Sequence, residues 1–199
     1  IYDLRSTSSA TTLVVSGIII SSGPLSTVIY NNFISDFKAP NSTSADAIRG
    51  INLATTTTNS NIGLYYNTIF LNAFAGGGNF GTAGIYHSNS TTATSGQLDM
   101  RNNIVVNNSV PNGTGKTSAF RRSASNVNLN NYSTLSNNNS FYAGTPGTSN
   151  VIFFDGTNFD QTLSEFKTRV APRETGSFSE NVPFVNNTTA PYDLHVRTD

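Results

Sequence analysis

The chain has 199 residues, long enough for one domain with a sizeable core, and its 11 Lys and Arg balance its 11 Asp and Glu. A chain without net charge has no electrostatic footprint for nucleic acid, and the absence of cysteine excludes disulfides, thiolate metal sites and cysteine nucleophiles. We expect no membrane span, because Ser16 and Gly17 interrupt the longest apolar stretch well short of the roughly 20 residues required.

Short runs of Ile, Val, Tyr and Phe bounded by turn residues predict strands along the whole chain. One series comprises "SGIIIS" (16–21), "AIRGIN" (47–52), "GIYHSN" (84–89), "AFRRSA" (119–124) and "VIFFDG" (151–156). A second series comprises "VIYNNFISDF" (28–37), "LYYNTIFLNAF" (64–74), "DMRNNIVVNNS" (99–109) and "TLSNNNSFYAG" (134–144). Helical spacing is confined to residues 160–171, where Leu163, Phe166 and Val170 predict a short helix or lid.

The two series repeat in phase. In the second, Asn32, Asn67, Asn103 and Asn139 are separated by 35, 36 and 36 residues, and in the first, Ile48, Ile85 and Phe120 lie 19, 18 and 19 residues before the next of these asparagines. Short strands at a fixed long period predict a solenoid with parallel strand stacking. We expect one all-β domain over residues 1–199 with about five coils and a repeat of ~36 residues. Its expected parts are a partial coil (1–13), regular coils (14–156) and a C-terminal coil and cap (157–199).

Asparagine is depleted in strands, yet each repeat places it against the apolar run. A sharp corner between strands needs residues that tolerate left-handed backbone, and Asn is the best after Gly. When the corner recurs, the amides of Asn32, Asn67, Asn103 and Asn139 are expected to stack as a hydrogen-bonded ladder. Inward stacks are expected to include Ile18, Ile48, Ile85, Phe120, Ile69 and Ile104.

The segments "VIYNNFIS", "GIYHSNSTTATSGQLDMRNNIVVNNS" and "NSFYAG…VIFFDG" resemble the repeats of right-handed parallel β-helix proteins, the pectin-lyase-like superfamily. More narrowly, they resemble the long Thr/Asn-rich β-helical proteins that bacteria export to their surface. The ending "TLSEF…ENVPFVNNTTAPYDLHV" is similar to the closing pattern of that group. The resemblance implies a secreted or cell-surface protein, but the fold hosts lyases, hydrolases, adhesins and passive stalks alike. The chain begins at Ile1 without Met or a signal-peptide pattern, and we interpret it as a piece of a longer or processed protein.

Catalytic and metal sites are not expected. Lyases of the superfamily use an Asp cluster binding Ca²⁺ with an Arg base, and its hydrolases use three Asp from adjacent coils. Here the aspartates form no paired pattern, and His87 and His195 lie in different parts of the repeat. "GGGNFG" and "GTGKT" imitate nucleotide-binding loops without the strand and helix context that such loops need, so no cofactor is expected. The scattered aspartates are Asp36, Asp46, Asp99, Asp155 and Asp160.

A possible ligand site lies on the first strand series. Stacking Ile48, Ile85 and Phe120 would place Arg49, Tyr86 and Arg121 in one outward row, with His87 and Arg122 adjacent. Aromatic faces and guanidinium groups suit sugar rings and acidic glycans. The alternative is a solvated face on which Arg merely stacks over Tyr.

The regular repeat and the neutral polar surface favour a non-catalytic structural module, such as a stalk, an adhesin, or a building block of a filament or surface layer. The alternative is a polysaccharide-binding or polysaccharide-cleaving β-helix, a lyase or hydrolase. Candidate partners are therefore a polysaccharide or other copies of the chain.

Overall fold

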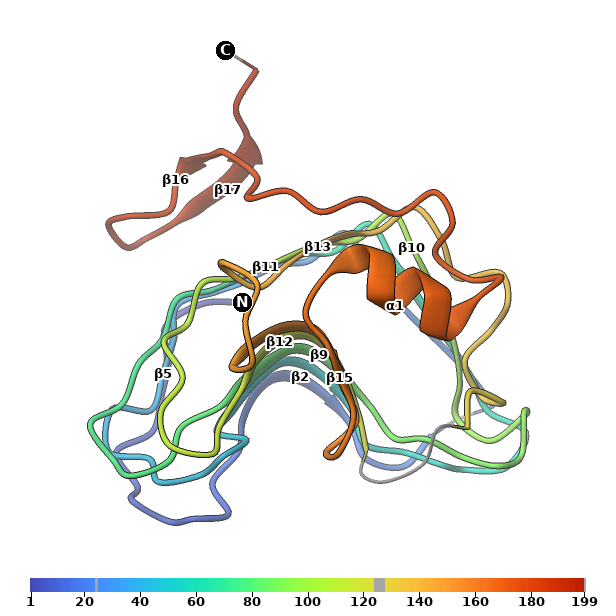
Figure 1. Cartoon of the computed structure of the whole chain (residues 1–199), viewed down its shortest axis with the longest axis horizontal. Coiled ribbons are helices and arrows are strands. Elements are labelled where there is room, and N and C mark those ends of the chain that lie inside the picture. Colours follow the sequence, from blue (N-terminus) through green and yellow to red (C-terminus); the bar gives the residue numbers. More distant parts are fainter. Residues whose placement is uncertain (24, 124–127, 199) are drawn as a thin grey trace.

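The computed structural model describes residues 1–23, 25–123 and 128–198. Its strands stack in parallel as a β-solenoid of about four coils, one fewer than the sequence predicts. Figure 1 looks down the stack, with successive coils overlying one another. Residues 24, 124–127 and 199, which fall within the predicted coils and cap, lie outside the described part.

Three sheets form the sides of the solenoid, and each of the first three coils contributes one strand to each sheet. The six-stranded sheet contains β2 (Val15–Ile20), β6 (Ile48–Leu53), β9 (Thr82–His87), β12 (Thr117–Arg122), β14 (Asn150–Phe154) and the antiparallel β15 (Phe159–Asp160). The three-stranded sheet contains β3 (Ser26–Tyr30), β7 (Asn61–Tyr65) and β10 (Gln97–Arg101). The four-stranded sheet contains β4 (Phe33–Ser35), β8 (Thr68–Leu71), β11 (Ile104–Asn107) and β13 (Ser140–Tyr142), and a short parallel pair joins β1 (Leu4–Arg5) to β5 (Phe37–Lys38).

Each sheet sends at least one apolar column into the core, because strand residues alternate between faces and parallel pairing places like residues side by side. The columns meet in a single buried cluster. Their members are Ile51–Ile85–Phe120–Phe153, Ile29–Leu64–Met100 and Ile34–Ile69–Val105–Phe141.

Of the predicted inward residues, Ile48, Ile69, Ile85 and Phe120 are fully buried, and Ile18 packs against the core while partly exposed. The prediction for Ile104 was wrong. Its neighbour Val105 takes the inward position, so Ile104 lies on the opposite face of β11 and packs outside the main core.

Glycines bring two of the sheets close together. Gly17, Gly50 and Gly84 occupy successive strands of the six-stranded sheet, just before the inward isoleucines. A Cβ on Gly50 would collide with the Ile69 side chain, and one on Gly84 would collide with Val105. The four-stranded sheet can therefore pack directly against this backbone only because these positions lack side chains.

A short helix closes the core beyond the last coil. Helix α1 (Leu163–Val170) begins with a capping box, in which Thr162 Oγ1 accepts from the Glu165 amide and Glu165 Oε2 accepts from the Thr162 amide. Its buried Phe166 stacks on Phe153, with ring centroids 5.5 Å apart. The helix predicted within 160–171 is thus present and covers one end of the core.

The C-terminal segment after the helix does not continue the coils. Strands β16 (Phe184–Asn186) and β17 (Asp193–Val196) form an antiparallel hairpin that lies beside the coils, as Figure 1 shows. Phe184 packs edge-on against Phe70, which points outward from β8, at 5.7 Å between centroids. The hairpin therefore covers the outer face of the four-stranded sheet rather than the end of the solenoid. No helix in the described part of the chain is long and apolar enough to cross a membrane.

Candidate functional site

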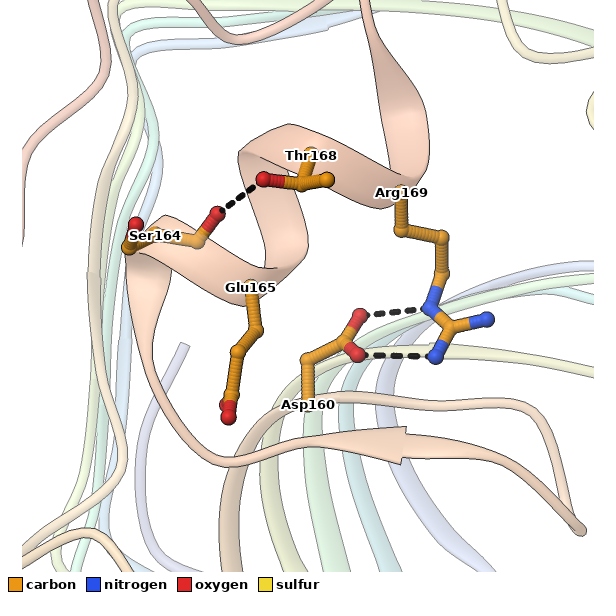
Figure 2. Close-up of a pocket in the computed structure, with 5 residues that line it drawn as sticks. All are labelled: Asp160, Ser164, Glu165, Thr168 and Arg169. Carbon is orange, nitrogen blue, oxygen red and sulfur yellow. Dashed lines mark hydrogen bonds and ion pairs between the residues drawn. The ribbon is translucent and has the colours of Figure 1, made fainter.

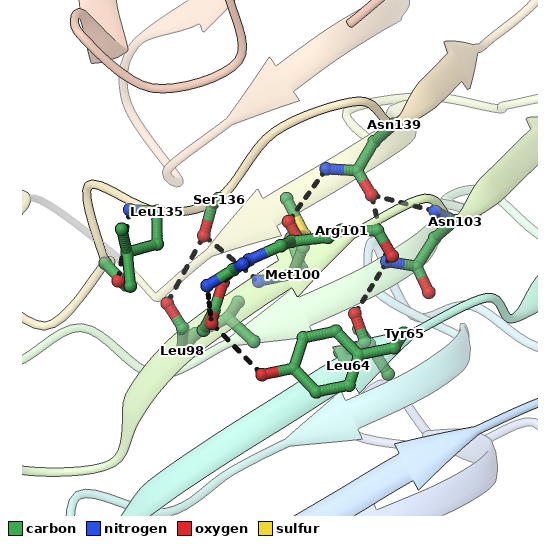
Figure 3. A network of polar contacts seen from close by, with 11 residues as sticks. Leu64, Tyr65, Leu98, Met100, Arg101, Asn103, Leu135, Ser136 and Asn139 are labelled. Carbon is green, nitrogen blue, oxygen red and sulfur yellow. Dashed lines mark hydrogen bonds and ion pairs between the residues drawn. The ribbon is translucent and has the colours of Figure 1, made fainter. Parts of the chain in front are cut away.

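The four repeat asparagines form one continuous hydrogen-bonded column. The Nδ2 of Asn32 donates to Oδ1 of Asn67 at 2.8 Å, Asn67 donates to Asn103 at 3.0 Å, and Asn103 donates to Asn139 at 2.9 Å. The same oxygens also accept from backbone: the Asn67 amide donates to Asn103 Oδ1 at 3.0 Å. Figure 3 shows Asn103 and Asn139 linked in this way. Each buried amide is thus satisfied by the coils on either side.

The column ends on a buried carboxyl. Asn139 Nδ2 donates to Glu174 Oε2 at 3.0 Å, and the hydroxyls of Tyr132 and Ser177 also bond to this carboxyl. Glu174 is fully buried, and desolvation raises its pKa above the ordinary value although these three groups oppose the shift. Nothing in the sequence pattern pointed to Glu174, because it lies outside the repeat.

The corner residue and the ladder residue are different asparagines. We predicted both roles for one position, but the left-handed backbone occurs one residue earlier. It is found at Asn31, Tyr66, Asn102 and Asn138, each with φ between 56° and 59°. The two asparagines of each pair therefore have different roles. The first adopts the left-handed backbone at the corner, and the second forms hydrogen bonds with the equivalent asparagines of adjacent coils. Tyr66 is the exception, because it holds the turn without being Asn or Gly.

The outward row of Arg49, Tyr86 and Arg121 is only partly in register. Tyr86 and Arg121 are partners, but the partner of Tyr86 in β6 is Asn52, because Ile51 rather than Ile48 aligns with Ile85. Loops of unequal length shift the strand series, so equal spacing from the asparagines did not give the correct alignment. Arg49 nevertheless reaches Tyr86, with its guanidinium carbon 3.4 Å from the ring centroid.

Asp46 joins the two arginines of this row, which we call the Arg–Tyr stripe (Arg49, Tyr86 and Arg121). It pairs with Arg49 and lies 3.0 Å from Arg121 Nη1. The side chains of Arg49 and Arg121 are only 13% and 17% exposed. Continuing the row, Arg121 lies 5.0 Å from the Phe154 ring, and Lys116 Nζ lies 4.5 Å from the Phe159 ring. Asp46, Lys116 and Phe154 were missed as members because the loop and strand contacts that bring them here cross between coils.

His87 and Arg122 do not belong to the outer stripe. Both are buried, because they take the inward alternation in β9 and β12. Arg122 Nη1 lies 2.8 Å from His87 Nδ1, while His87 Nε2 lies 2.8 Å from the Gly96 carbonyl oxygen. Donation from Nε2–H to the carbonyl leaves Nδ1 as the acceptor of the arginine proton, so the imidazole is neutral. Burial, reinforced by Arg122, lowers the pKa of His87 to about 3.

The carboxylates are engaged in structural contacts. Asp155 accepts from the amides of Thr157 and Asn158 in a turn, and Asp99 binds Arg101 and the Tyr65 hydroxyl. Asp36 pairs with Lys38. Within the described residues, no group of three or more His, Asp or Glu side chains is placed to hold a metal ion.

An open pocket lies where α1 meets β15 (Figure 2). Arg169 binds both oxygens of Asp160, at 2.6 and 2.8 Å, and the Thr168 hydroxyl donates to the Ser164 carbonyl oxygen. Glu165 is used by the capping box. The charged groups around this pocket are therefore already paired with one another or with backbone, which leaves none poised for acid–base chemistry.

Comparison of the chain with protein-family models, with curated proteins and with solved structures finds no match.

Proposed function

We propose that this chain is a non-catalytic structural or adhesive module of a secreted bacterial surface protein: a stalk, an adhesin, or a building block of a filament or surface layer. Within that proposal, it is of the Thr/Asn-rich, pectin-lyase-like type that its repeats resemble. The observation that carries the proposal is that the buried and half-buried carboxyl groups already have partners. Asp46, Asp155, Asp160 and Glu174 are each committed to a guanidinium group, a turn or the ladder.

Polysaccharide cleavage needs a carboxylate or base that is free to exchange a proton or hold a cation at the scissile bond. Both oxygens of Asp160 are bonded to Arg169, so neither is free to contact a substrate hydroxyl or a cation. This supports a passive scaffold over a lyase or hydrolase.

The test is a turnover assay on polygalacturonate and on neutral β-linked polymers. We expect neither unsaturated products nor new reducing ends from the wild-type chain. Release of either product would overturn the proposal, provided that Asp46→Asn or Asp160→Asn abolishes it and so excludes a contaminant.

A glycan-binding role is the second candidate, and the Arg–Tyr stripe favours it. Three cations, Arg49, Arg121 and Lys116, alternate with aromatic rings around a single carboxylate, Asp46. The excess positive charge suits an acidic glycan. Binding of polygalacturonate that is lost in Arg49→Ala and Arg121→Ala would establish this role, and binding unaffected by both would place the site elsewhere.

A further inference from the structure

Three tyrosines lie at the ends of the first two strands of the three-stranded sheet, which is a different sheet from that of the Arg–Tyr stripe. Tyr30 and Tyr65 are register partners in neighbouring strands, and Tyr66 follows at the corner. Tyr30 is 61% exposed and Tyr66 is 60% exposed. We call Tyr30, Tyr65 and Tyr66 the tyrosine patch. A group of neighbouring exposed aromatic residues marks a candidate binding surface, whereas single exposed apolar residues are common.

The central ring of the patch is held in place. The Tyr65 hydroxyl donates to Asp99 Oδ2 at 3.0 Å, and Arg101 binds the same carboxylate through Nε at 2.9 Å and Nη2 at 2.6 Å. Figure 3 shows Tyr65 and Arg101 within this network. The ring lies against the backbone of Gly63, where an added Cβ would collide with it. It is therefore a fixed surface rather than a freely rotating side chain.

Tyr66 is held in an unfavourable conformation. It has φ of 56°, and the equivalent positions in the other coils, Asn31, Asn102 and Asn138, all carry the residue that tolerates this backbone. Within the described residues, the Tyr66 side chain makes no hydrogen bond and no ring contact that would compensate the strain. Asn would fit this corner with less strain, as it does in the other coils. A strained, exposed Tyr in its place indicates that the side chain contacts something outside the fold.

We propose that the tyrosine patch binds a neutral polysaccharide chain. This deepens the adhesive part of the proposed function and rests on it. Aromatic faces carry negative charge density, which attracts the C–H bonds on the face of a pyranose ring. Neighbouring strands are about 4.8 Å apart, so Tyr30 and Tyr65 can contact consecutive sugar units. Tyr30 and Tyr66 are exposed residues whose hydroxyls can form hydrogen bonds with sugar hydroxyls.

The charge of the patch favours a neutral ligand over an acidic one. Asp99 and Arg101 neutralise each other beside Tyr65, so the patch has no uncompensated cation. This distinguishes it from the Arg–Tyr stripe, where cations are in excess. The rigid, flat presentation of Tyr65 also suits a repetitive polymer better than a shaped protein partner, which would need a central pocket.

The test measures binding of the full chain to microcrystalline cellulose, to chitin and to a soluble neutral β-glucan, with polygalacturonate as the acidic comparison. We expect binding to at least one neutral polymer, reduced at least tenfold by Tyr30→Ala and by Tyr66→Asn. The second variant introduces the residue found at three equivalent corners, so it is expected to fold. Phe74→Ala removes a more exposed aromatic residue outside the patch and is expected to bind as wild type does.

Several outcomes would overturn the inference: no binding to any neutral polymer, equal binding by wild type and both tyrosine variants, or binding to polygalacturonate alone. Self-association in sedimentation that is lost in Tyr30→Ala, without glycan binding, would also overturn it, in favour of an interface between copies. The turnover assay remains separate, because a product there would defeat the proposed function whether or not the patch binds.

Discussion

At the scale of single residues, the ladder concentrates many hydrogen bonds on one amide. Asn67 accepts from the side chain and the backbone amide of Asn32, and donates to Asn103 and to the carbonyls of Ile29 and Tyr65. Asn67→Ala leaves these buried partners unsatisfied, and we expect a loss of about 2–3 kcal/mol in the free energy of unfolding, measured in urea.

The matched control is Asn61→Ala. Asn61 is exposed on β7, and its side chain has no hydrogen bond within the described residues, so the change is expected within about 0.5 kcal/mol of wild type. Identical urea midpoints for the two variants would contradict the structural role of the ladder.

At the strained corner, by contrast, we expect a substitution to raise the free energy of unfolding. Asn tolerates the left-handed backbone that costs Tyr about 1 kcal/mol, so Tyr66→Asn is expected to raise the free energy of unfolding by about that amount. The reverse exchange, Asn102→Tyr, should lower it by a similar amount. Thermal unfolding measures both, and a loss of stability in Tyr66→Asn would show that its side chain is needed by the fold rather than by a ligand.

Buried His87 makes stability depend on acidity. Its folded pKa of about 3 lies below the unfolded value near 6.5, so the contribution is present above pH 6.5 and is lost as the pH falls toward 3. We expect wild type to lose about 2–3 kcal/mol between pH 7 and 4.5 from this group. His87→Gln, which can still accept from Arg122, should lack this component in urea titrations, and an unchanged slope would contradict the neutral imidazole.

At the scale of elements, α1 contributes mainly through Phe166, which packs against the rings of Phe120, Phe141 and Phe153. Phe166→Ala opens a cavity at the end of the core, and we expect a loss of about 3–4 kcal/mol in the free energy of unfolding. Ser164→Ala on the exposed face of the same helix is the control and is expected to be nearly neutral. A small effect of Phe166→Ala would mean that the core is closed without the helix.

The elements differ in how far the sequence could predict them. Helix α1 was predictable because Leu163, Phe166 and Val170 share one face, and the ladder was predictable because its spacing is nearly constant. The six-stranded sheet was misaligned because Ile48 and Ile51 both follow the apolar pattern, and only packing selects Ile51 to pair with Ile85. The burial of His87 and Arg122 depends on that same packing.

At the scale of the whole molecule, the repeat specified the solenoid because coils with similar spacing must stack to bury their apolar faces. Features that occur once, including the buried carboxyl of Glu174 and the outer hairpin, had no periodic signal. The tyrosine patch could not be predicted from the sequence for a related reason. Tyr66 occupies a repeat position, and its difference from Asn31, Asn102 and Asn138 becomes informative only when the backbone angle is known.

Two buried groups make the stability of the whole molecule depend on pH in opposite directions: His87 lowers it in acid, and Glu174 lowers it as the pH rises. Burial raises the folded pKa of Glu174 above 4.5, so the folded chain holds a proton that the unfolded chain has released, and stability falls as the pH rises from 4.5 through the folded pKa. Glu174→Gln is neutral at every pH and can still accept from Asn139. The difference in unfolding free energy between this variant and wild type should therefore shift in favour of Gln as the pH rises from 4.5. Urea unfolding at pH 4 to 8 measures it, and a difference that is constant, or that shifts toward wild type, would show that Glu174 is ionised in the folded ladder.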